Sequence, residues 1–261
     1  MSAMFDVRIQ KLKEQIKKEK LDGVFISSIS NIEYLTGYSN FSKDEREAYI
    51  FIGKSFQYII TDGRYSEAIK RGVPHLALFE RGNKKSIEDL FKKHKNEIIT
   101  LGIEEDNLTV SEHKLIKKHF KNLKHFEVNK LRSVKSDEEI KKIEQACQIG
   151  DLAFDFILKK MKISVTEKEI AQELENFVRQ QEANVAFPYI VAFGKNSSVP
   201  HHQTGDTKLK KGNFVLLDFG AKVDGYCSDM TRTVFFGKPS EKQMNIYKTV
   251  FEAQQKAVDF I

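Results

Sequence analysis

The stretch Asn213-Phe-Val-Leu-Leu-Asp-Phe-Gly-Ala-Lys-Val-Asp-Gly-Tyr-Cys-Ser-Asp-Met-Thr-Arg-Thr-Val-Phe-Phe236 decides the local fold of the second half of the chain. Two runs rich in β-branched and aromatic residues flank the dipeptide Asp224-Gly225. Asp-Gly between such runs is a strong signal for a tight turn, so the pattern predicts a β-hairpin. The two arms of this hairpin carry one aspartate each, Asp218 and Asp229.

The length of the turn decides which residues face each other. Side chains alternate between the two faces of a strand, and directly opposed residues share a face. A loop formed by Val223-Asp224 places Asp218 opposite Asp229. A loop formed by Asp224-Gly225 places Asp218 opposite Thr231, and Asp229 is then its diagonal neighbour. Both registers put the two carboxylates on one face, whereas an odd loop without a bulge would separate them.

Carboxylates side by side in this place need a partner. Asp218 lies within the run 215–219, whose apolar residues predict a buried strand. Two ionised carboxylates there would repel each other and lose solvation. They could share a proton, or a hard divalent cation could bind both. The alternative is two unrelated surface aspartates on an exposed hairpin.

The wider sequence resembles a known family. Four motifs follow one another in the order used by the pita-bread metallopeptidases: 187–194 (Phe-Pro-Tyr-Ile-Val-Ala-Phe-Gly), 199–202 (Val-Pro-His-His), 216–220 (Leu-Leu-Asp-Phe-Gly) and 228–233 (Ser-Asp-Met-Thr-Arg-Thr). That family includes the Xaa-Pro aminopeptidases (aminopeptidase P), the Xaa-Pro dipeptidases (prolidases) and the methionine aminopeptidases. The resemblance implies a metal-dependent peptidase.

The front half of the chain extends the resemblance. Residues 31–37 and 60–65 are similar to the N-terminal domain of the proline-specific members, of the creatinase/prolidase type, which methionine aminopeptidases lack. Helical and strand patterns alternate before residue 130, which predicts an α/β domain with a mixed sheet over 1–130. The resemblance implies the first half of an α+β pita-bread catalytic domain over 131–261.

Individual elements can be placed from periodicity and capping signals. We expect helices ending near Lys20 and at 65–70 and 87–94, and strands at 21–27, 48–52, 57–61, 76–79 and 100–103, with a 53–56 turn between the second and third. Three further helices are predicted behind the capping boxes Ser136…Glu139, Thr166…Glu169 and Ser240…Gln243.

The resemblance assigns roles to three residues. It implies two divalent metal ions, with Mn²⁺ the expected metal and Co²⁺ or Zn²⁺ as alternatives. Asp218 and Asp229 would be metal ligands, with Asp229 bridging the ions. His201 matches the family's histidine that assists substrate binding and proton transfer, a role that suits an imidazole near neutral pH.

Neighbouring residues are given supporting roles. His202 is expected to be structural. Thr231 and Arg232 are expected to orient Asp229 or to pair locally. Tyr34 and the 38–41 loop are expected to be core or domain-interface residues.

The ligand set that the resemblance implies is incomplete in this chain. It consists of two aspartates from the first half, and of one histidine and two glutamates from the second. No histidine follows His202, and the only glutamates after Asp229 are Glu241 and Glu252, on a predicted helix. That helix ends at Ile261 on an apolar stripe without a cap. We therefore expect a longer natural protein and an inactive 1–261 polypeptide that self-associates or is covered by further chain.

Composition excludes several other classes of function. The chain has 261 residues and a formal net charge of +6, and its lysines are interleaved with acidic residues along amphipathic helices. This pattern predicts a solvated surface rather than a nucleic-acid interface. No segment has the apolar length of a membrane span or a signal peptide. The two cysteines, Cys147 and Cys227, are far apart in the sequence, so we expect a cytoplasmic protein.

The leading hypothesis is a Xaa-Pro aminopeptidase, a homodimer that releases the N-terminal residue from peptides with proline at the second position. An Xaa-Pro dipeptidase with the same first half is the alternative. A non-catalytic binding protein that keeps the pita-bread scaffold is the hypothesis from another class. The presence of Asp218, Asp229 and His201 together argues against it.

Overall fold

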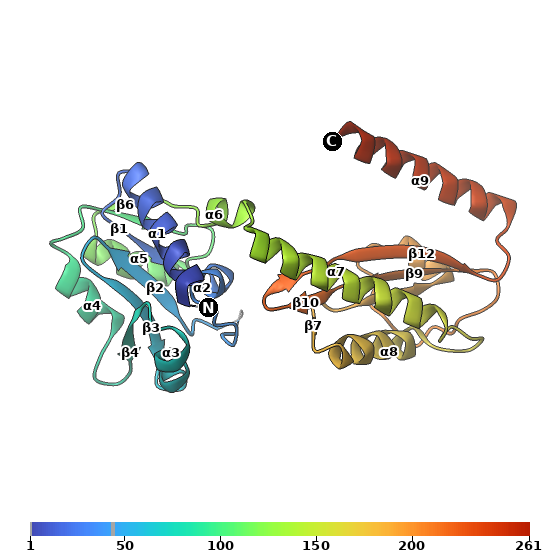
Figure 1. The fold of residues 1–261 in the computed structure, drawn as a ribbon, viewed down its shortest axis with the longest axis horizontal. Helices are drawn as coiled ribbons and strands as arrows, with labels where there is room; N and C mark the ends of the chain where they lie inside the picture. The colour runs from blue at the N-terminus through green and yellow to red at the C-terminus, as the bar shows by residue number, and fades with distance from the viewer. Residues whose placement is uncertain (1, 43–44) are drawn as a thin grey trace. The chain divides into compact units, whose positions relative to one another are not determined.

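The computed structural model describes residues 2–42 and 45–261, which divide into two compact units, 1–135 and 136–261 (Figure 1). Within these described ranges no sheet is shared between the units, and each unit has its own hydrophobic core. No helix in the described part of the chain has both the length and the apolar character needed to cross a membrane.

The first unit is built on one six-stranded sheet with the order β4-β3-β2-β1-β5-β6. The pairs β1–β2 and β2–β3 are antiparallel and the other three are parallel, so the predicted mixed sheet is confirmed. Its strands are β1 (Gly23–Ile26), β2 (Tyr49–Gly53), β3 (Gln57–Asp62), β4 (Ala77–Arg81), β5 (Thr100–Ile103) and β6 (Asn122–His125). Its helices are α1 (Ser2–Lys18), α2 (Ile29–Thr36), α3 (Ser66–Gly72), α4 (Ile87–His94), α5 (Val110–His119) and α6 (Asn129–Ser133).

Helices cover both faces of this sheet. Val24 and Ile26 of β1 belong to the same core cluster as Leu12 of α1. Phe25, between them, points to the other face and clusters with Phe91 of α4. A strand buried on both faces needs a continuous apolar run, which explains the sequence of β1.

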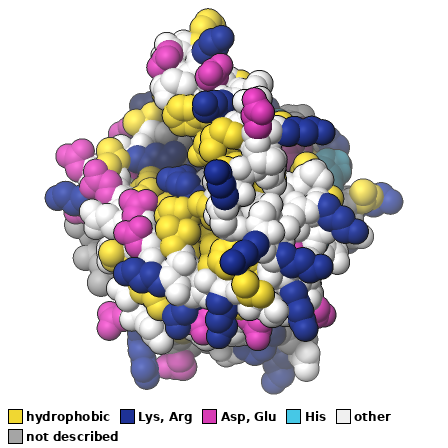
Figure 2. All heavy atoms as spheres, turned by 90° about the vertical axis from the view of Figure 1, so that its right-hand side faces the viewer, with side chains coloured by type: hydrophobic (Ala, Val, Ile, Leu, Met, Phe, Trp, Pro, Cys, Tyr) yellow, Lys and Arg dark blue, Asp and Glu magenta, His cyan; other side chains and the backbone are white. Residues whose placement is uncertain are grey.

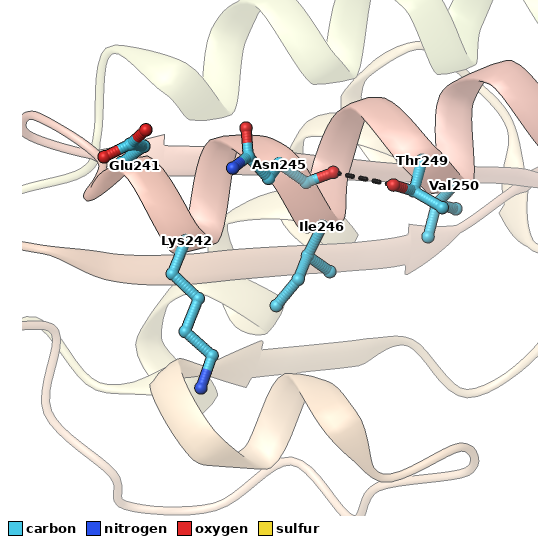
Figure 3. Close-up of a pocket in the computed structure, with 6 residues that line it drawn as sticks. All are labelled: Glu241, Lys242, Asn245, Ile246, Thr249 and Val250. Carbon is cyan, nitrogen blue, oxygen red and sulfur yellow. Dashed lines mark hydrogen bonds between the residues drawn. The ribbon is translucent and has the colours of Figure 1, made fainter.

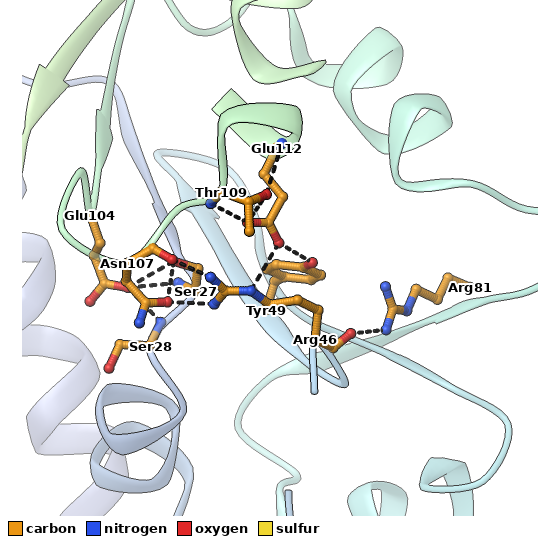
Figure 4. Close-up of polar contacts among 9 residues, drawn as sticks. All are labelled: Ser27, Ser28, Arg46, Tyr49, Arg81, Glu104, Asn107, Thr109 and Glu112. Atoms are coloured by element: carbon orange, nitrogen blue, oxygen red, sulfur yellow. Dashed lines mark hydrogen bonds and ion pairs between the residues drawn. The ribbon is translucent and has the colours of Figure 1, made fainter. Parts of the chain in front are cut away.

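A buried carboxylate fastens β1 to α2 (Figure 4). Glu104 is 6% exposed, and its Oε2 accepts hydrogen bonds from the backbone N–H groups of Ser27 and Ser28, both at 2.7 Å. Its Oε1 accepts from Asn31 Nδ2 at 2.5 Å. Asn31 begins the 31–37 motif, so this part of the motif has a structural role.

The second unit contains two three-stranded sheets, with the orders β12-β9-β8 and β11-β10-β7. The three predicted capping boxes are all present, at the starts of α7, α8 and α9. The elements are α7 (Asp137–Leu158), α8 (Glu167–Gln180), β7 (Asn184–Val185), β8 (Ile190–Phe193), the 3₁₀ helix η1 (Gly194–Ser198), β9 (Asn213–Phe219), β10 (Ala221–Val223), β11 (Tyr226–Cys227), β12 (Met230–Phe236) and α9 (Glu241–Phe260).

The two faces of the β12-β9-β8 sheet differ. Val215, Leu217 and Phe219 of β9 are fully buried and belong to one cluster with apolar residues of α7 and α8. The alternating residues Leu216 and Asp218 are only partly buried and lie on the other face. We call this second side the open face of the sheet.

Candidate active site

The predicted hairpin is present, and its turn is formed by Asp224 and Gly225. Both residues have positive φ, +47° and +91°, as a type I′ turn requires. The flanking pairs are Lys222 with Cys227 and Val223 with Tyr226. The loop therefore has an even number of residues, which excludes the arrangement that would separate the two aspartates.

The same register continues into β9 and β12. Asp218 lies directly opposite Thr231, and Phe219 lies opposite Met230. This is the second of the two registers expected from the sequence. Asp229 directly precedes β12 and is exposed, between the buried residues Ser228 and Met230. By this alternation Asp229 lies on the open face, diagonal to Asp218.

A glycine lets the two arms approach between the aspartates. A Cβ atom on Gly220 would lie 2.0 Å from the carbonyl oxygen of Ser228, closer than any side chain could. The Ser228 hydroxyl oxygen accepts a hydrogen bond from the Ala221 N–H at 3.0 Å. The backbone between Asp218 and Asp229 is thus closely packed.

One hydroxyl orients Asp218. Thr231 Oγ1 donates to Asp218 Oδ1 at 3.1 Å. Thr231 was expected to orient Asp229 or to pair locally, and the hydrogen bond it makes is with its cross-strand neighbour Asp218. Arg232 pairs locally, as one of the two expectations had it, since its Nη1 donates to the Thr231 carbonyl oxygen at 3.0 Å.

His201 lies in an exposed turn between η1 and β9, with φ at +56°. The base of this loop is fastened to β8, the neighbour of β9. Thr204 Oγ1 accepts from the Val191 N–H at 2.8 Å and donates to the Tyr189 carbonyl oxygen at 3.1 Å. Ile190, between them, is paired with Asp218. The loop that carries His201 is therefore attached one strand away from Asp218.

The structural role expected for His202 is confirmed, and it involves a residue that the sequence reasoning missed. Glu167, at the start of α8, is fully buried, and its Oε2 lies 3.0 Å from His202 Nε2. It also accepts from Phe193 N–H, Asn196 Nδ2 and Gly205 N–H at 2.8–3.0 Å. Burial alone would raise the pKa of Glu167, but these four hydrogen bonds together hold that pKa below its ordinary value of 4.5.

A second contact that the sequence did not indicate lies at the hairpin tip. Tyr226 donates its hydroxyl hydrogen to Glu139 Oε1 at 2.8 Å. Glu139 was expected only as part of a capping box, which it also completes. Lys142, one turn further along α7, pairs with Asp224 at 3.3 Å. These contacts tie the turn between the two aspartates to α7.

The open face carries two carboxylates that could bind a metal ion. Asp218 and Asp229 offer carboxylate oxygens on one face, which suits a hard divalent cation. Within residues 2–42 and 45–261, however, no group of three or more His, Cys, Asp or Glu side chains could hold a metal ion. By themselves the two aspartates fall short of such a group.

Apolar residues of α9 remain exposed. Ile246 is 50% and Val250 is 64% exposed, and together with Glu241, Lys242, Asn245 and Thr249 they line a hollow of about 550 Å³ (Figure 3). Figure 2 shows apolar side chains gathered in a hollowed part of the second unit, with lysines and arginines around them. The hollow of Figure 3 is lined by residues of α9 and includes neither Asp218 nor Asp229.

Comparison with known proteins identifies the family. A model of the creatinase/prolidase N-terminal domain matches residues 8–134, and a model of metallopeptidase family M24 matches residues 141–261. An uncharacterized peptidase of Bacillus subtilis, YqhT, is 35% identical over 260 residues, which are 98% of this chain and 72% of that protein. The chain belongs to metallopeptidase family M24.

Solved structures of M24-type peptidases are similar over nearly the whole chain. An Xaa-Pro dipeptidase from Bacillus anthracis is 34% identical, with a TM-score of 0.85 over 96% of this chain and 70% of that one. An X-Pro aminopeptidase from Thermotoga maritima is 32% identical, with a TM-score of 0.76 over 92% and 70%. The predicted family and fold class are confirmed: a creatinase-type N-terminal domain precedes part of a pita-bread domain.

Proposed function

We propose that this M24 peptidase is an Xaa-Pro aminopeptidase, which releases the N-terminal residue from peptides that have proline at the second position. The observation that carries the proposal is the placement of Asp218 and Asp229 on the open face of one hairpin. The creatinase/prolidase-type N-terminal domain supports the proline specificity. So does the similarity of nearly the whole chain to an Xaa-Pro dipeptidase and to an X-Pro aminopeptidase.

The chain's own residues would act as follows. Asp218 and Asp229 would hold two divalent ions, for which we propose Mn²⁺, and such ions would supply an acidified water as the nucleophile. Thr231 keeps Asp218 Oδ1 in position through its hydroxyl. His201 binds the substrate and moves a proton at its exposed imidazole. The bond before proline has no N–H, so recognition must use the substrate's shape and free amino group instead.

An Xaa-Pro dipeptidase is the second candidate function. The similarity to the Bacillus anthracis Xaa-Pro dipeptidase, with a TM-score of 0.85, favours it. Both candidates use the same aspartates and the same histidine, so substrate length is what distinguishes them.

The test uses the natural gene product. It is loaded with Mn²⁺, Co²⁺ or Zn²⁺ and given an Xaa-Pro dipeptide or an Xaa-Pro-Yaa tripeptide. We expect the gene product to release the first residue from the tripeptide. Cleavage of the dipeptide alone would favour the dipeptidase. No cleavage of either peptide by the gene product would contradict both and favour a non-catalytic binding protein.

The remaining expectations about the assembly stay predictions. The homodimer is tested by light scattering of the gene product. The choice of Mn²⁺ is tested by comparing activity after reconstitution with each metal, because carboxylate and imidazole ligands alone do not select one.

A further inference from the structure

We propose that Glu167 is a positioning residue, which holds the 193–205 loop in the shape that presents the His201 imidazole to the substrate. The inference rests on the proposed function in so far as it concerns His201. It starts from the burial of Glu167, which is 0% exposed although it is a carboxylate. A buried charge of this kind persists only where hydrogen bonds replace the lost water.

The hydrogen bonds to Glu167 come from both ends of the loop. Phe193 N–H and Asn196 Nδ2 donate to Oε1 from its beginning, at 2.8 and 2.9 Å. Gly205 N–H donates to Oε2 from its end, at 3.0 Å, and His202 Nε2 lies 3.0 Å from the same oxygen. One carboxylate thus joins the two ends of the loop, as backbone hydrogen bonds between paired strands do in a hairpin.

Backbone hydrogen bonds from α8 reinforce this arrangement. The N–H of Glu167 donates to the Thr207 carbonyl oxygen at 3.1 Å, and the N–H of Lys168 donates to the Gly205 carbonyl oxygen at 3.0 Å. These two N–H groups belong to the first turn of α8, where they have no partner within the helix. The end of the loop is therefore fastened to the helix that carries Glu167.

The conformation of His201 explains why the loop needs this support. The N–H of His202 donates to the Val199 carbonyl oxygen at 3.2 Å, which closes a turn with Pro200 and His201 at its centre. Proline followed by a residue with positive φ is the pattern of a type II turn, whose third position favours glycine. The φ of His201 is +56°, in the left-handed region, which is energetically unfavourable for any residue other than glycine. Contacts around the turn must offset this strain. One of them holds His202, the last residue of the turn, against Glu167.

The test compares Glu167→Gln with Glu173→Gln in the natural gene product. Glu173 lies on the same helix and forms a half-exposed ion pair with Lys160. In Glu167→Gln the side-chain nitrogen faces hydrogen-bond donors and cannot accept from them. We therefore expect hydrogen exchange of the backbone amides in 193–205 to become at least about 10-fold faster, which corresponds to a loss of about 1.4 kcal/mol in the free energy of opening. We expect kcat to fall more than KM rises, and Glu173→Gln to match the wild type in both measurements.

His202 variants separate positioning from folding. His202→Ala removes the ring but leaves the three other donors on Glu167, so the fold should survive while the turn loosens. His202→Gln keeps a donor and should restore part of kcat. Unchanged exchange in Glu167→Gln would overturn the inference, and so would full kcat in a variant with a loosened loop. A wild-type protein that cleaves no Xaa-Pro peptide would contradict the proposed function, whereas the exchange comparison would still test the hold of Glu167 on the loop.

Discussion

The two faces of the β12-β9-β8 sheet share the same strands but carry different residues. On the face toward α7 and α8, Val215, Leu217 and Phe219 are fully buried. On the open face, Leu216 and Asp218 alternate with them and are only partly buried. Alternation along one strand thus places core residues and a proposed metal ligand at adjacent positions. Substitutions on one face should change the free energy of unfolding, and substitutions on the other should change metal binding.

The largest effect on stability is expected at the buried face. Leu217→Ala removes a fully buried side chain from the helix-covered core and should cost about 2–5 kcal/mol. Leu216→Ala, at the neighbouring position on the open face, should cost less than half of that. Chemical denaturation of both variants measures the difference. Equal losses would show that the two faces are not distinct in stability.

A smaller loss is expected between the aspartates. Gly220→Ala puts a methyl group 2.0 Å from the Ser228 carbonyl oxygen, so the arms of the hairpin must move apart. We expect a loss of about 1–3 kcal/mol together with weaker metal binding. Gly72→Ala is the control, since a methyl group there meets no atom within 4 Å. Wild-type stability in Gly220→Ala would contradict the close approach.

The contribution of Glu167 to the free energy of unfolding should depend on pH. Its pKa is lower in the folded protein than its ordinary value of 4.5, so the unfolded chain binds the proton more readily. Its stabilising contribution is therefore complete above about pH 4.5 and is lost as the pH falls through the lower folded pKa. Glu167→Gln should cost about 1–3 kcal/mol at pH 7.

Denaturation of the wild type and of Glu167→Gln between pH 3 and pH 7 measures this dependence. The difference between the two proteins should shrink on acidification. A difference that stays constant over the whole range would contradict a lowered pKa for Glu167.

The smallest effect is expected at the hairpin tip. Tyr226→Phe removes the hydroxyl that donates to Glu139 Oε1 and should cost about 0.5–1.5 kcal/mol. The turn itself should persist, because Asp224 and Gly225 keep their positive φ angles. Thermal unfolding measures the loss, and exchange of the 221–229 amides measures any loosening. A loss above about 3 kcal/mol would show that α7, rather than the register, holds the hairpin.

Much of the fold could be predicted because its signals are local. The hairpin follows from Asp224-Gly225 and its flanks, and the helices of the second unit follow from capping boxes such as Ser136…Glu139. The helix at Ile29–Thr36 was missed, because the side chain of its N-cap residue Ser28 makes no capping hydrogen bond. Glu104, distant in the sequence, accepts from the Ser28 N–H instead. The short strands Asn184–Val185 and Asn122–His125 depend on tertiary pairing and carry no periodicity of their own.

The candidate site could be predicted as far as strand alternation reaches. To place Asp218 and Asp229 on one face, it is enough to know that the turn has an even number of residues. To find the partner of Thr231, one must also know which residues of the two strands are paired. The role of Glu167 could not be predicted, since its partners lie 26 to 38 residues away in loops without a pattern. Its position, acidic and next to the capping residue Thr166, is typical of any solvated helix start.

The claim that Asp218 and Asp229 form a metal site on the open face is tested most directly by metal affinity. Asp218→Asn and Asp229→Asn are compared with Asp224→Asn, the same change at the exposed tip of the same hairpin. Titration calorimetry of the natural gene product with Mn²⁺ gives the affinity of each. We predict that the first two bind at least about 10-fold more weakly than the wild type and that Asp224→Asn binds equally well. Wild-type affinity in Asp218→Asn or Asp229→Asn would contradict the account.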